Sequence, residues 1–305
     1  MAICKSMEIS APKEWFGLLD ILEKGIAILL GATDTGKSTL AQFLIFHLCQ
    51  RGLKVALVDG DIGQSFLGPP ATIGLAVFKS DPDWEVVLSP PEIFFVGSTT
   101  PEGHFPIHLK GVKWMVDKVS SYGPDVILVD TTGFVLGEAG RELKRRKIDL
   151  VSPRFILALQ KYDEIEPILE PYKENPAYKI YRLPLSEKVR TRSMEERRIN
   201  RANKFRNYFR DSVTQELAIE EVQIEGEVLD PSGALLPLDF SLRINGLLIG
   251  LKDGNDDTLA LGLIRNYFEE RKVIRVSTPL REIQRVKTIR LSSLRLVLLY
   301  EDESS

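Results

Sequence analysis

The chain has 305 residues, of which 44% are hydrophobic and 27% are charged, and its formal net charge is −3. A chain of this length can bury a large core and suits one large domain plus a smaller one. The slight negative charge excludes a generally basic surface, so any basic site must be local. Its two cysteines, Cys4 and Cys49, are too few for a disulfide framework and lack zinc-site spacing. No apolar stretch approaches about 18 residues and no signal peptide is evident, so we expect a cytoplasmic protein that does not contact a membrane.

From residue 25 to about residue 181, strand-like and helix-like segments alternate. Continuous Val, Ile and Leu runs separated by helical patterns are typical of a mainly parallel sheet with helices on both faces. The expected strands are Gly25–Leu30, Val55–Val58, Ile93–Val96, Val126–Val129, Phe155–Leu159 and Lys179–Leu183. The expected helices are Leu40–Cys49, Val112–Val119, Glu138–Lys147 and Glu164–Tyr172. We therefore expect an α/β fold whose ligands bind at the carboxyl ends of the strands.

The segment between the first strand and the first helix fits the phosphate-loop pattern G-x-x-x-x-G-K-[ST]. In this context loop amides and a helix N-terminus face an anion. Lys37 is expected to reach the β- and γ-phosphates, and the Ser38 hydroxyl to hold a magnesium ion. The predicted nucleotide-binding residues are Gly31, Thr33, Asp34, Thr35, Gly36, Lys37, Ser38 and Thr39. The sequence thus predicts a P-loop NTPase that binds a nucleoside triphosphate, ATP or GTP.

Two carboxylates, Asp59 and Asp61, follow the second expected strand and should lie near the phosphate loop. One can support magnesium or its water ligands, and the other can accept a proton from an attacking hydroxyl. We predict a metal site formed by Ser38, Asp59 and Asp61. The two aspartates alone do not separate a kinase from a hydrolase.

Residues 186–210 are strongly basic and contain no Gly or Pro, which predicts a long helix with a loop before it. Nine cations against three glutamates favour an anionic partner. Arg192 and Arg197 are five residues apart, so on one continuous helix they would point in different directions. We therefore expect Arg192 to precede the helix, with Ser193 as its N-cap and Glu196 completing a capping box. The nine cations are Lys188, Arg190, Arg192, Arg197, Arg198, Arg201, Lys204, Arg206 and Arg210.

Beyond Asp211, short apolar runs separated by turn clusters predict a small β-barrel or β-sandwich domain. These runs are Ile219–Val228, Leu238–Ile244, Leu247–Leu251, Leu259–Leu263, Val273–Ser277 and Leu296–Tyr300. This part shows no catalytic constellation, and we expect it to bind or to cap something. The predicted division is a lead-in (residues 1–24), a P-loop domain (25–212, with a lid at about 186–210) and a β-rich domain (213–305).

Taken together and in this order, the motifs resemble those of the polynucleotide 5′-hydroxyl kinases. That family includes the kinase subunit of the pre-mRNA cleavage factor, the nucleolar pre-rRNA kinases and archaeal relatives. The resemblance extends over roughly residues 25–210, and the chain looks closest to the short prokaryotic-type members. The motifs that carry it are Gly31–Thr39, Asp59–Ser65, Gly68–Gly74, Gly97–Pro101, Thr131–Phe134 and the spaced arginines of Arg192–Phe209.

The resemblance implies transfer of a γ-phosphate to the 5′-hydroxyl of RNA, with DNA left open as a further acceptor. It implies that Asp61 activates this hydroxyl, while Lys37 and Ser38 hold the phosphates and Mg²⁺. It also implies that Arg192 and Arg197 close over the transferring group. Arginines that arrive on closure can stabilise charge spread over the equatorial oxygens. The implied catalytic residues are Lys37, Asp61, Arg192 and Arg197.

The residues expected to contact nucleic acid are Gln64, Thr99, Thr100, Phe134, Arg201 and Lys204. The first three match family positions near the acceptor strand. The family motif after the fourth strand usually reads T-x-G-W, and its Trp stacks on the terminal base. This chain has Phe134 there, which can also stack on a base but offers a smaller face. Arg201 and Lys204 are expected to serve the nucleic-acid backbone or packing.

Two alternatives stay open at this point. Asp130–Gly133 (DTTG) matches the D-x-x-G pattern of GTPases, and Gln160–Asp163 (QKYD) resembles the guanine-reading N-K-x-D motif with Gln in place of Asn. In a GTPase, Asp163 would accept hydrogen bonds from the guanine ring. The other alternative is a nucleotide-loaded scaffold without turnover in an RNA-processing complex. Partner proteins and oligomeric state are left open by the sequence.

Overall fold

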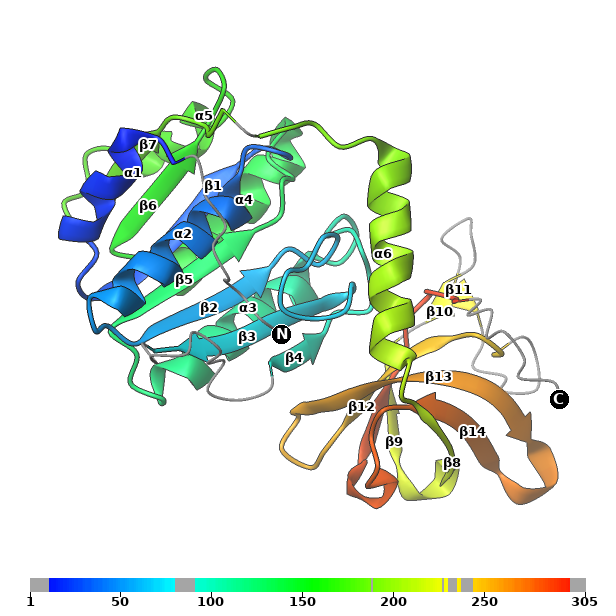
Figure 1. Cartoon of the computed structure of the whole chain (residues 1–305). Coiled ribbons are helices and arrows are strands. Elements are labelled where there is room, and N and C mark those ends of the chain that lie inside the picture. The colour runs from blue at the N-terminus through cyan, green and yellow to red at the C-terminus, as the bar shows by residue number, and fades with distance from the viewer. Residues whose placement is uncertain are drawn as a thin grey trace, which may run out of the picture.

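The computed structural model describes residues 11–79, 91–187, 189–226, 228–229, 235–236 and 244–296. Its main feature is a 13-stranded sheet, which carries helices along its N-terminal half (Figure 1). The strands of this half are β1 (Gly25–Gly31), β2 (Val55–Gly60), β3 (Thr72–Phe78), β4 (Glu92–Phe95), β5 (Val126–Thr131), β6 (Phe155–Leu159) and β7 (Lys179–Leu183). The helices are α1 (Lys13–Gly17), α2 (Lys37–Gln50), α3 (Phe105–Ser120), α4 (Gly137–Val151), α5 (Glu166–Leu169) and α6 (Met194–Phe209), with 3-10 turns η1 (Leu18–Asp20) and η2 (Glu170–Tyr172).

The order β7-β6-β1-β5-β2 forms the parallel part of the sheet, as their continuous apolar sequences predict. Strands β3 and β4 extend it in the antiparallel sense. β3 is absent from the expected strands because Pro69, Pro70 and Gly74 indicate a turn in that region. The carboxyl ends of β1, β2 and β5 meet at one edge, which collects the predicted site residues.

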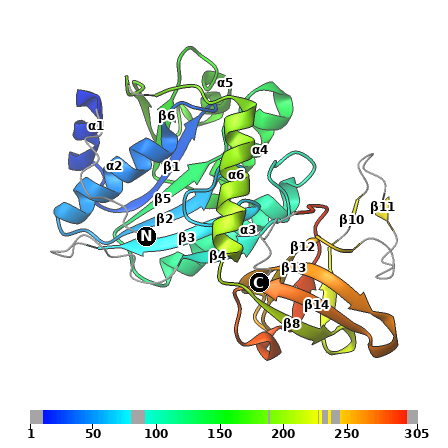
Figure 2. The same ribbon diagram turned by 45° about the vertical axis from the view of Figure 1, so that its right-hand side comes forward.

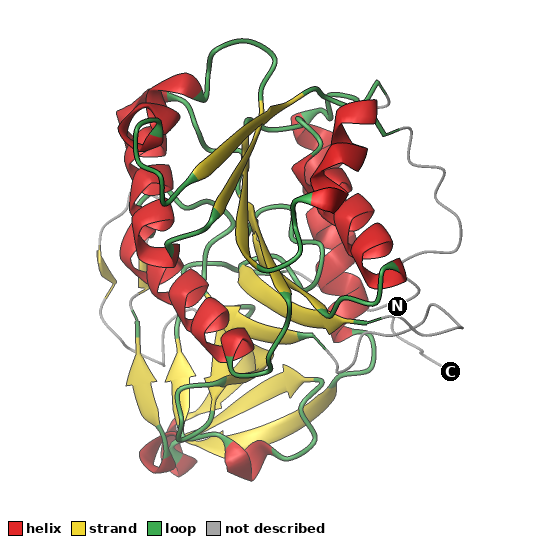
Figure 3. Ribbon diagram, turned by 90° about the vertical axis from the view of Figure 1, so that its left-hand side faces the viewer, coloured by secondary structure: helices red, strands yellow, loops and turns green. Residues whose placement is uncertain are grey.

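Helices cover both faces of the parallel strands (Figure 3). In β1, Ala27 and Leu29 belong to the core that includes residues of α1 and α2. Ile28 and Leu30 belong to the opposite core, which includes residues of α3 and α4. Side chains of a strand alternate between its faces, so a strand with helices on both sides must be apolar throughout. Among the described residues, no helix is long and apolar enough to cross a membrane.

The segment before β1 is more than a lead-in. Trp15 in α1 is fully buried, and its Nε1 donates a hydrogen bond of 3.0 Å to the carbonyl oxygen of Pro184. Its ring packs edge-on against Phe43 of α2, with the centroids 5.7 Å apart. Trp15, Leu18 and Leu19 are therefore part of the core beside α2.

The basic segment forms α6 with the N-terminus that the sequence predicts. Ser193 Oγ accepts a hydrogen bond of 3.1 Å from the Glu196 N–H, and the Ser193 N–H donates one of 2.7 Å to Glu196 Oε2. The capping box is therefore confirmed. Phe205 and Phe209 near the other end of the helix are buried against β13 and its neighbours. Figures 1 and 2 show α6 standing across the carboxyl ends of the parallel strands.

The C-terminal strands continue the same sheet. They are β8 (Val213–Ala218), β9 (Gln223–Glu225), β12 (Leu248–Lys252), β13 (Thr258–Phe268), β14 (Val273–Thr278) and β15 (Thr288–Arg290); β10 (Val228–Leu229) pairs with β11 (Leu235–Leu236). Three 3-10 turns, η3 (Ile219–Glu221), η4 (Glu269–Arg271) and η5 (Ile283–Arg285), lie among them. β13 joins β4 through the pair Thr258–Ile93, and the Phe95 N–H donates to Thr258 Oγ1 over 3.1 Å.

The expected run 219–228 is divided by η3 and Gly226 into β9 and β10. Residues 238–243 and 297–300, which hold most of two other expected strands, lie outside the described residues. β8 and β15 were not expected as strands. The division at residues 212 and 213 stays a prediction, because β13 pairs with β4, the last strand of the N-terminal half of the sheet.

Candidate active site

The phosphate loop joins β1 to α2 and folds closely on itself. Gly36 has φ 89° and Asp34 has φ 56°, both in the left-handed region. Thr35 Oγ1 donates to the Ala32 carbonyl oxygen over 3.0 Å, and Lys37 Nζ donates to the same oxygen over 2.8 Å. No side chain caps α2, so its first N–H groups are available to an anion.

Lys37 points toward the backbone of its own loop. Only 5% of the residue is exposed, and burial lowers the pKa of its ammonium, while Asp130 and Asp61 act in the opposite direction. A phosphate group placed at the loop would bring the negative charge that this buried cation lacks. Lys37 therefore has the position required for a phosphate ligand.

A carboxylate at the end of β5 lies beside Ser38. The Ser38 hydroxyl donates to Asp130 Oδ2 over 2.6 Å. Burial, and then the charge of Asp59, raise the pKa of Asp130 to about 6. A P-loop hydroxyl beside a strand-end aspartate is the pair that holds Mg²⁺ in P-loop NTPases. Asp130, considered from the sequence only for a GTPase, is thus the better candidate for the metal site.

Asp59 binds the loop that follows β2 with both of its carboxylate oxygens. Its Oδ2 accepts hydrogen bonds of 3.0 Å from Ser65 Oγ and 3.0 Å from the Leu67 N–H, and another from the Phe66 N–H. Its Oδ1 accepts one of 3.1 Å from the Asp61 N–H. Both oxygens thus bind the loop that follows β2 and shape the segment that carries Asp61. The role of Asp59 as a metal ligand stays a prediction.

Asp61 keeps one carboxylate oxygen available. Its Oδ1 accepts hydrogen bonds from the N–H groups of Gly63 and Gln64, at 3.1 and 3.0 Å. Within the described part of the chain, no hydrogen bond reaches Oδ2. The side chain is half-buried at the same sheet edge as Asp130. A half-buried carboxylate with one open oxygen is suited to accept a proton from a hydroxyl.

Two lysines of α4 that were not among the predicted site residues lie near these carboxylates. Lys144 and Lys147 are completely buried. Lys144 Nζ donates to the carbonyl oxygen of Thr132 and to its Oγ1, the latter over 3.2 Å. Lys147 Nζ has no hydrogen-bond partner among the described residues and lies 3.7 Å from the position that a Cβ on Gly60 would take. Burial lowers the pKa of Lys147 to about 8, against the opposing effect of Asp61 and Asp130.

His108 of α3 completes this buried layer. Its Nε2 donates to the Gly60 carbonyl oxygen over 3.0 Å, and its Nδ1 has no partner among the described residues. Burial, with the charges of Lys147 and Lys144, holds the pKa of His108 well below its usual value. The ring is therefore neutral and supports the end of β2. One signal was present: Lys144, Lys147 and Ile148 fall on the apolar face of α4.

The lid arginines meet the phosphate loop at Asp34. The Arg192 N–H donates to Asp34 Oδ2 over 2.9 Å, and its Nε donates to Oδ1 over 3.2 Å. Arg197 Nη2 donates to Oδ2 over 2.5 Å. Burial would raise the pKa of Asp34, but these hydrogen bonds and the charge of Arg197 outweigh it and hold the pKa below its usual value. Arg192 lies before α6 and Arg197 in its first turn, so both reach one group as the spacing argument predicts.

Gln64 joins the Asp61 loop to the lid. Its Nε2 donates to the Arg197 carbonyl oxygen over 3.3 Å, and its Oε1 accepts from Asn200 Nδ2 over 2.8 Å. Lys204 Nζ donates to the Ser65 carbonyl oxygen, and burial lowers the pKa of Lys204. Lys204 thus packs against this loop, which is the second of the two roles expected for it, and its contact with nucleic acid stays a prediction.

Arg201, Thr99, Thr100 and Phe134 remain as candidate acceptor contacts. Arg201 is half-buried and has no hydrogen bond or ion pair with any described residue. Thr99 and Thr100 lie in the loop after β4, and the Thr99 carbonyl oxygen approaches Gly63 so closely that a Cβ there would be 2.8 Å away. Phe134 meets Phe105 edge-to-face with the centroids 6.2 Å apart. The structure therefore adds Phe105 to the predicted aromatic position.

The two GTPase-like motifs have structural explanations of their own. A Cβ on Gly133 would lie 2.3 Å from Thr33 Oγ1, so this glycine lets the β5 loop pack on the phosphate loop. Gln160 donates to Glu166 Oε1 over 2.8 Å and accepts from the Ile165 N–H over 3.2 Å. These bonds hold the Gln160 turn without a guanine base.

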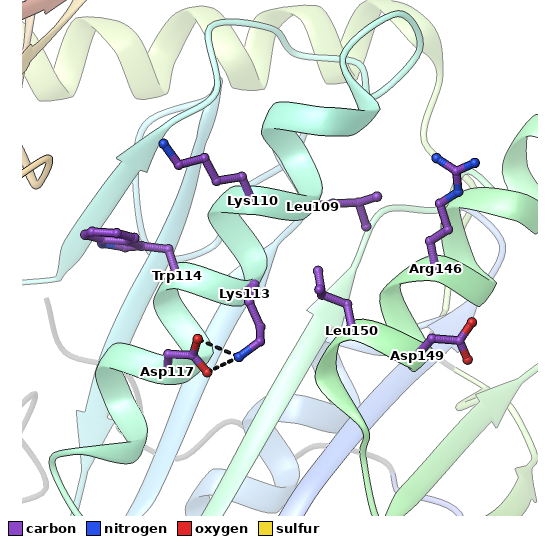
Figure 4. A pocket seen from close by; sticks show the side chains of 8 residues that line it. All are labelled: Leu109, Lys110, Lys113, Trp114, Asp117, Arg146, Asp149 and Leu150. Atoms are coloured by element: carbon purple, nitrogen blue, oxygen red, sulfur yellow. Dashed lines mark hydrogen bonds and ion pairs between the residues drawn. The ribbon is translucent and has the colours of Figure 1, made fainter.

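A hollow of about 650 Å³ between α3 and α4 lies apart from these residues (Figure 4). Leu109 and Leu150 point toward each other from the two helices, with Lys113 and Asp117 paired at the side over 2.5 Å. None of the predicted site residues lines it. The candidate active site is therefore the carboxyl edge of β1, β2 and β5 under α6, and not this hollow.

Comparison with known proteins agrees with this geometry. Residues 31–211 match the family described as mRNA cleavage and polyadenylation factor CLP1 P-loop. A polyribonucleotide 5′-hydroxyl-kinase of Thermococcus kodakarensis is 34% identical, over 88% of this chain and 87% of its own. The enzyme of the same name from Methanocaldococcus jannaschii is 31% identical, over 88% and 86%.

A solved structure of a wild-type Clp1p–Pcf11p complex contains a chain with the same fold. It aligns with a TM-score of 0.73 at 17% identity, over 93% of this chain and 79% of that one. At 17% sequence identity the structural similarity shows the fold alone, which is the P-loop α/β fold described above. With more than half of its residues matched, the chain belongs to the CLP1 P-loop family.

Proposed function

We propose that this protein is a polynucleotide 5′-hydroxyl kinase, which transfers the γ-phosphate of ATP or GTP to the 5′-hydroxyl of RNA. The proposal rests on three features that meet at one edge of the sheet. These are a phosphate loop, a carboxylate with an open oxygen (Asp61) and a pair of lid arginines that reach the loop. Curated relatives that cover most of the chain carry the name polyribonucleotide 5′-hydroxyl-kinase.

In this proposal Asp61 Oδ2 accepts the proton of the 5′-hydroxyl as its oxygen attacks the γ-phosphorus. Lys37 leaves the Ala32 carbonyl and binds the β- and γ-phosphates. Arg192 and Arg197, which now bind Asp34, transfer part of their hydrogen bonding to the phosphoryl oxygens. Phosphoryl transfer depends mainly on such positioning and charge stabilisation.

The residues present fit a magnesium ion. Ser38 and Asp130 offer two adjacent oxygens, and Mg²⁺ commonly takes one or two protein ligands and completes its shell with phosphates and water. Among the described residues, no group of three or more His, Cys, Asp or Glu could hold a metal by itself. Mg²⁺ would neutralise charge on the donor phosphates, so we propose that it binds together with the nucleotide.

The acceptor strand would enter beside the loop after β4. Phe134 and Phe105 offer an aromatic surface on which a terminal base can stack, and Arg201 offers a cation without a protein partner in the described residues. Thr99 lies against the Asp61 loop at Gly63, and Thr100 follows it in the chain. Stacking on an aromatic ring is tolerant of base identity, so this site suits a kinase that acts on strands with different 5′-terminal bases.

The test is a transfer assay with γ-labelled ATP or GTP and a 5′-hydroxyl oligoribonucleotide, with the 5′-phosphorylated oligonucleotide as control. We expect label on the hydroxyl-ended strand alone, and its loss in Asp61→Asn. Release of free phosphate regardless of oligonucleotide would instead favour the GTPase. Nucleotide binding without either product would favour the scaffold and contradict the kinase.

A further inference from the structure

A second hollow, of about 430 Å³, lies where the C-terminal strands meet the loop after β4. From that loop it is lined by Gly97, Gly103 and His104, and from the C-terminal strands by Gly226, Arg290 and Ser293. We propose that this hollow binds a backbone phosphate of the acceptor strand, downstream of the 5′ end. The proposal rests on the kinase function and assigns to the C-terminal strands a share of acceptor binding.

Glycine keeps the hollow open. Gly97, Gly103 and Gly226 have φ of 84°, 74° and 85°, where other residues are strained. A Cβ on Gly97 would lie 3.0 Å from Ser292 Cβ, and one on Gly226 would lie 2.9 Å from the Leu291 carbonyl oxygen. Main chain therefore approaches closely at this wall, and a residue larger than glycine would be strained or would collide there.

Arg290 gives the hollow its charge. Its Nη1 donates to Glu225 Oε1 over 3.3 Å, but Lys252 Nζ shares the same oxygen over 2.5 Å. Arg290 Nε is buried and has no hydrogen-bond partner among the described residues. Lys252 Nζ also pairs with Asp256, so the group left without a partner in the described part of the chain is the Nε donor of Arg290. A phosphate oxygen would supply the missing acceptor beside a guanidinium cation.

His104 borders the same hollow beside Arg290. Burial, and then the charge of Arg290, hold the pKa of His104 below its usual value, so the ring is neutral at physiological pH. A neutral imidazole can donate one hydrogen bond to a phosphate or a ribose hydroxyl without needing a counter-ion. The hollow therefore combines a cation that has an unsatisfied donor with a neutral ring donor.

The position of the hollow follows the expected direction of the strand. The loop of residues 97–104 contacts the Asp61 loop through Thr99 and Gly63, and its two ends line the hollow. A strand whose terminal hydroxyl lies at Asp61 and which passes Thr99 and Thr100 would next reach Arg290. The donor nucleotide lies on the other side, at the phosphate loop, so a strand phosphate is the occupant that this placement favours.

The experiment compares acceptors of two lengths, a 5′-hydroxyl dinucleotide and a 5′-hydroxyl decanucleotide. In Arg290→Gln we expect the KM of the decanucleotide to rise about tenfold, with the dinucleotide KM and both kcat values unchanged. The slope of log affinity against log salt should fall by about one. Arg285→Gln is the matched control, because Arg285 is an exposed C-terminal arginine paired with Glu282.

A second variant protects the test against misfolding of the first. Ser293 is exposed at the rim, so Ser293→Glu should fold and should weaken decanucleotide binding by charge repulsion. Equal effects on both acceptor lengths, or no effect in either folded variant, would overturn the proposal. Inorganic phosphate that binds in an Arg290-dependent way without weakening of the decanucleotide would assign the hollow to a free anion instead.

Binding of a labelled decanucleotide, measured by fluorescence anisotropy without nucleotide, separates this inference from the proposed function. If Arg290→Gln weakens this binding while wild type transfers no label, the kinase proposal fails and the phosphate site stands. If transfer occurs normally and binding is insensitive to Arg290 and Ser293, only the phosphate site fails.

Discussion

The segment of Arg192 and helix α6, and helix α4, bring positive charge to the same strand ends in different physical states. Arg192 and Arg197 have side chains 40% and 24% exposed, and both bind Asp34. Lys144 and Lys147 of α4 are fully buried, and Lys147 has no hydrogen-bond partner in the described residues. The first pair is partly hydrated and binds one carboxylate whose side chain is only 3% exposed, whereas the second pair is enclosed in the core.

The arginines can bring their positive charge to the site when the lid closes, whereas the buried lysines are at the site in every state of the protein. An arginine keeps its proton at any physiological pH, and its planar fork can exchange a carboxylate for a phosphoryl group. A buried lysine loses protonation readily and cannot move without disturbing the core. We infer that α6 acts on the transition state, while α4 sets the electrostatics of Asp61 and Asp130 in every state of the protein.

Removal of a lid arginine should have the largest effect on kcat. Arg192→Ala or Arg197→Ala should lower kcat by at least about 10²-fold, with little change in triphosphate affinity, because the lost contact matters most in the transition state. Single-turnover transfer rates and nucleotide titrations measure the two quantities. Arg198→Ala is the control on the same helix, since Arg198 is exposed and pairs with Glu195. Near wild-type kcat in both variants would remove the lid from the mechanism.

Replacement of Lys147 by Met should have an intermediate effect. The neutral side chain no longer offsets the negative charges of Asp61 and Asp130, so Asp61 should become a less available base and kcat should fall about tenfold. Lys113→Met, at an exposed site on α3, is the control. Unchanged kcat in a folded Lys147→Met protein would show that the buried charge is not used in catalysis.

The same variant has a predicted stability signature. The pKa of Lys147 is about 8 in the folded protein, against about 10.4 when unfolded, so the unfolded chain binds more protons between these values. Wild-type stability should therefore rise with pH from about 8 to about 10.4. Below pH 8, Lys147→Met should be more stable than wild type by up to about 3 kcal/mol, and this gap should close toward pH 10. Urea unfolding at both ends of the range measures it; a less stable variant at neutral pH contradicts the prediction.

Loosening the contact between the lid and the Asp61 loop should have a smaller effect on kcat. Asn200→Ala removes the 2.8 Å hydrogen bond to Gln64 Oε1, which is one bond worth about 1 kcal/mol. We expect the lid to close less often and kcat to fall about threefold to fivefold, with nucleotide affinity unchanged. Asn203→Ala, a change of the same kind on the exposed face of α6, should leave kcat as it is. Equal effects of the two variants would mean that the Gln64 contact does not hold the lid.

The smallest effect is expected at Asp163. If the cations of the phosphate loop and lid dominate nucleotide binding, the guanine or adenine ring contributes little to the affinity. Asp163→Ala should then leave the ratio of GTP to ATP activity unchanged. Asp163 is exposed, so the variant should fold normally. A fall in the GTP activity alone, measured in parallel transfer assays, would restore Gln160–Asp163 as a guanine-reading motif.

Local patterns in the sequence determined much of the fold and of the phosphate loop. Continuous apolar runs fixed the parallel strands, because a strand covered on both faces has no polar side. The capping box at Ser193 and Glu196 placed the start of α6, since it depends on residues three apart. The same spacing argument placed Arg192 before the helix, which lets it reach Asp34 together with Arg197.

Contacts between distant segments decided the rest. Asp130 accepts a hydrogen bond from Ser38, whereas Asp59 accepts its hydrogen bonds from the loop after β2. Only the tertiary structure shows how the two carboxylates are divided between these partners. The burial of Lys147 follows from the packing of α4 on the sheet, and a lysine at a helical position is exposed in most proteins. The hollow at Arg290 exists because β13 pairs with β4, which brings segments almost 200 residues apart to one place. Hydrogen bonds and burial between such segments leave no local pattern, so the tertiary structure alone assigns these roles.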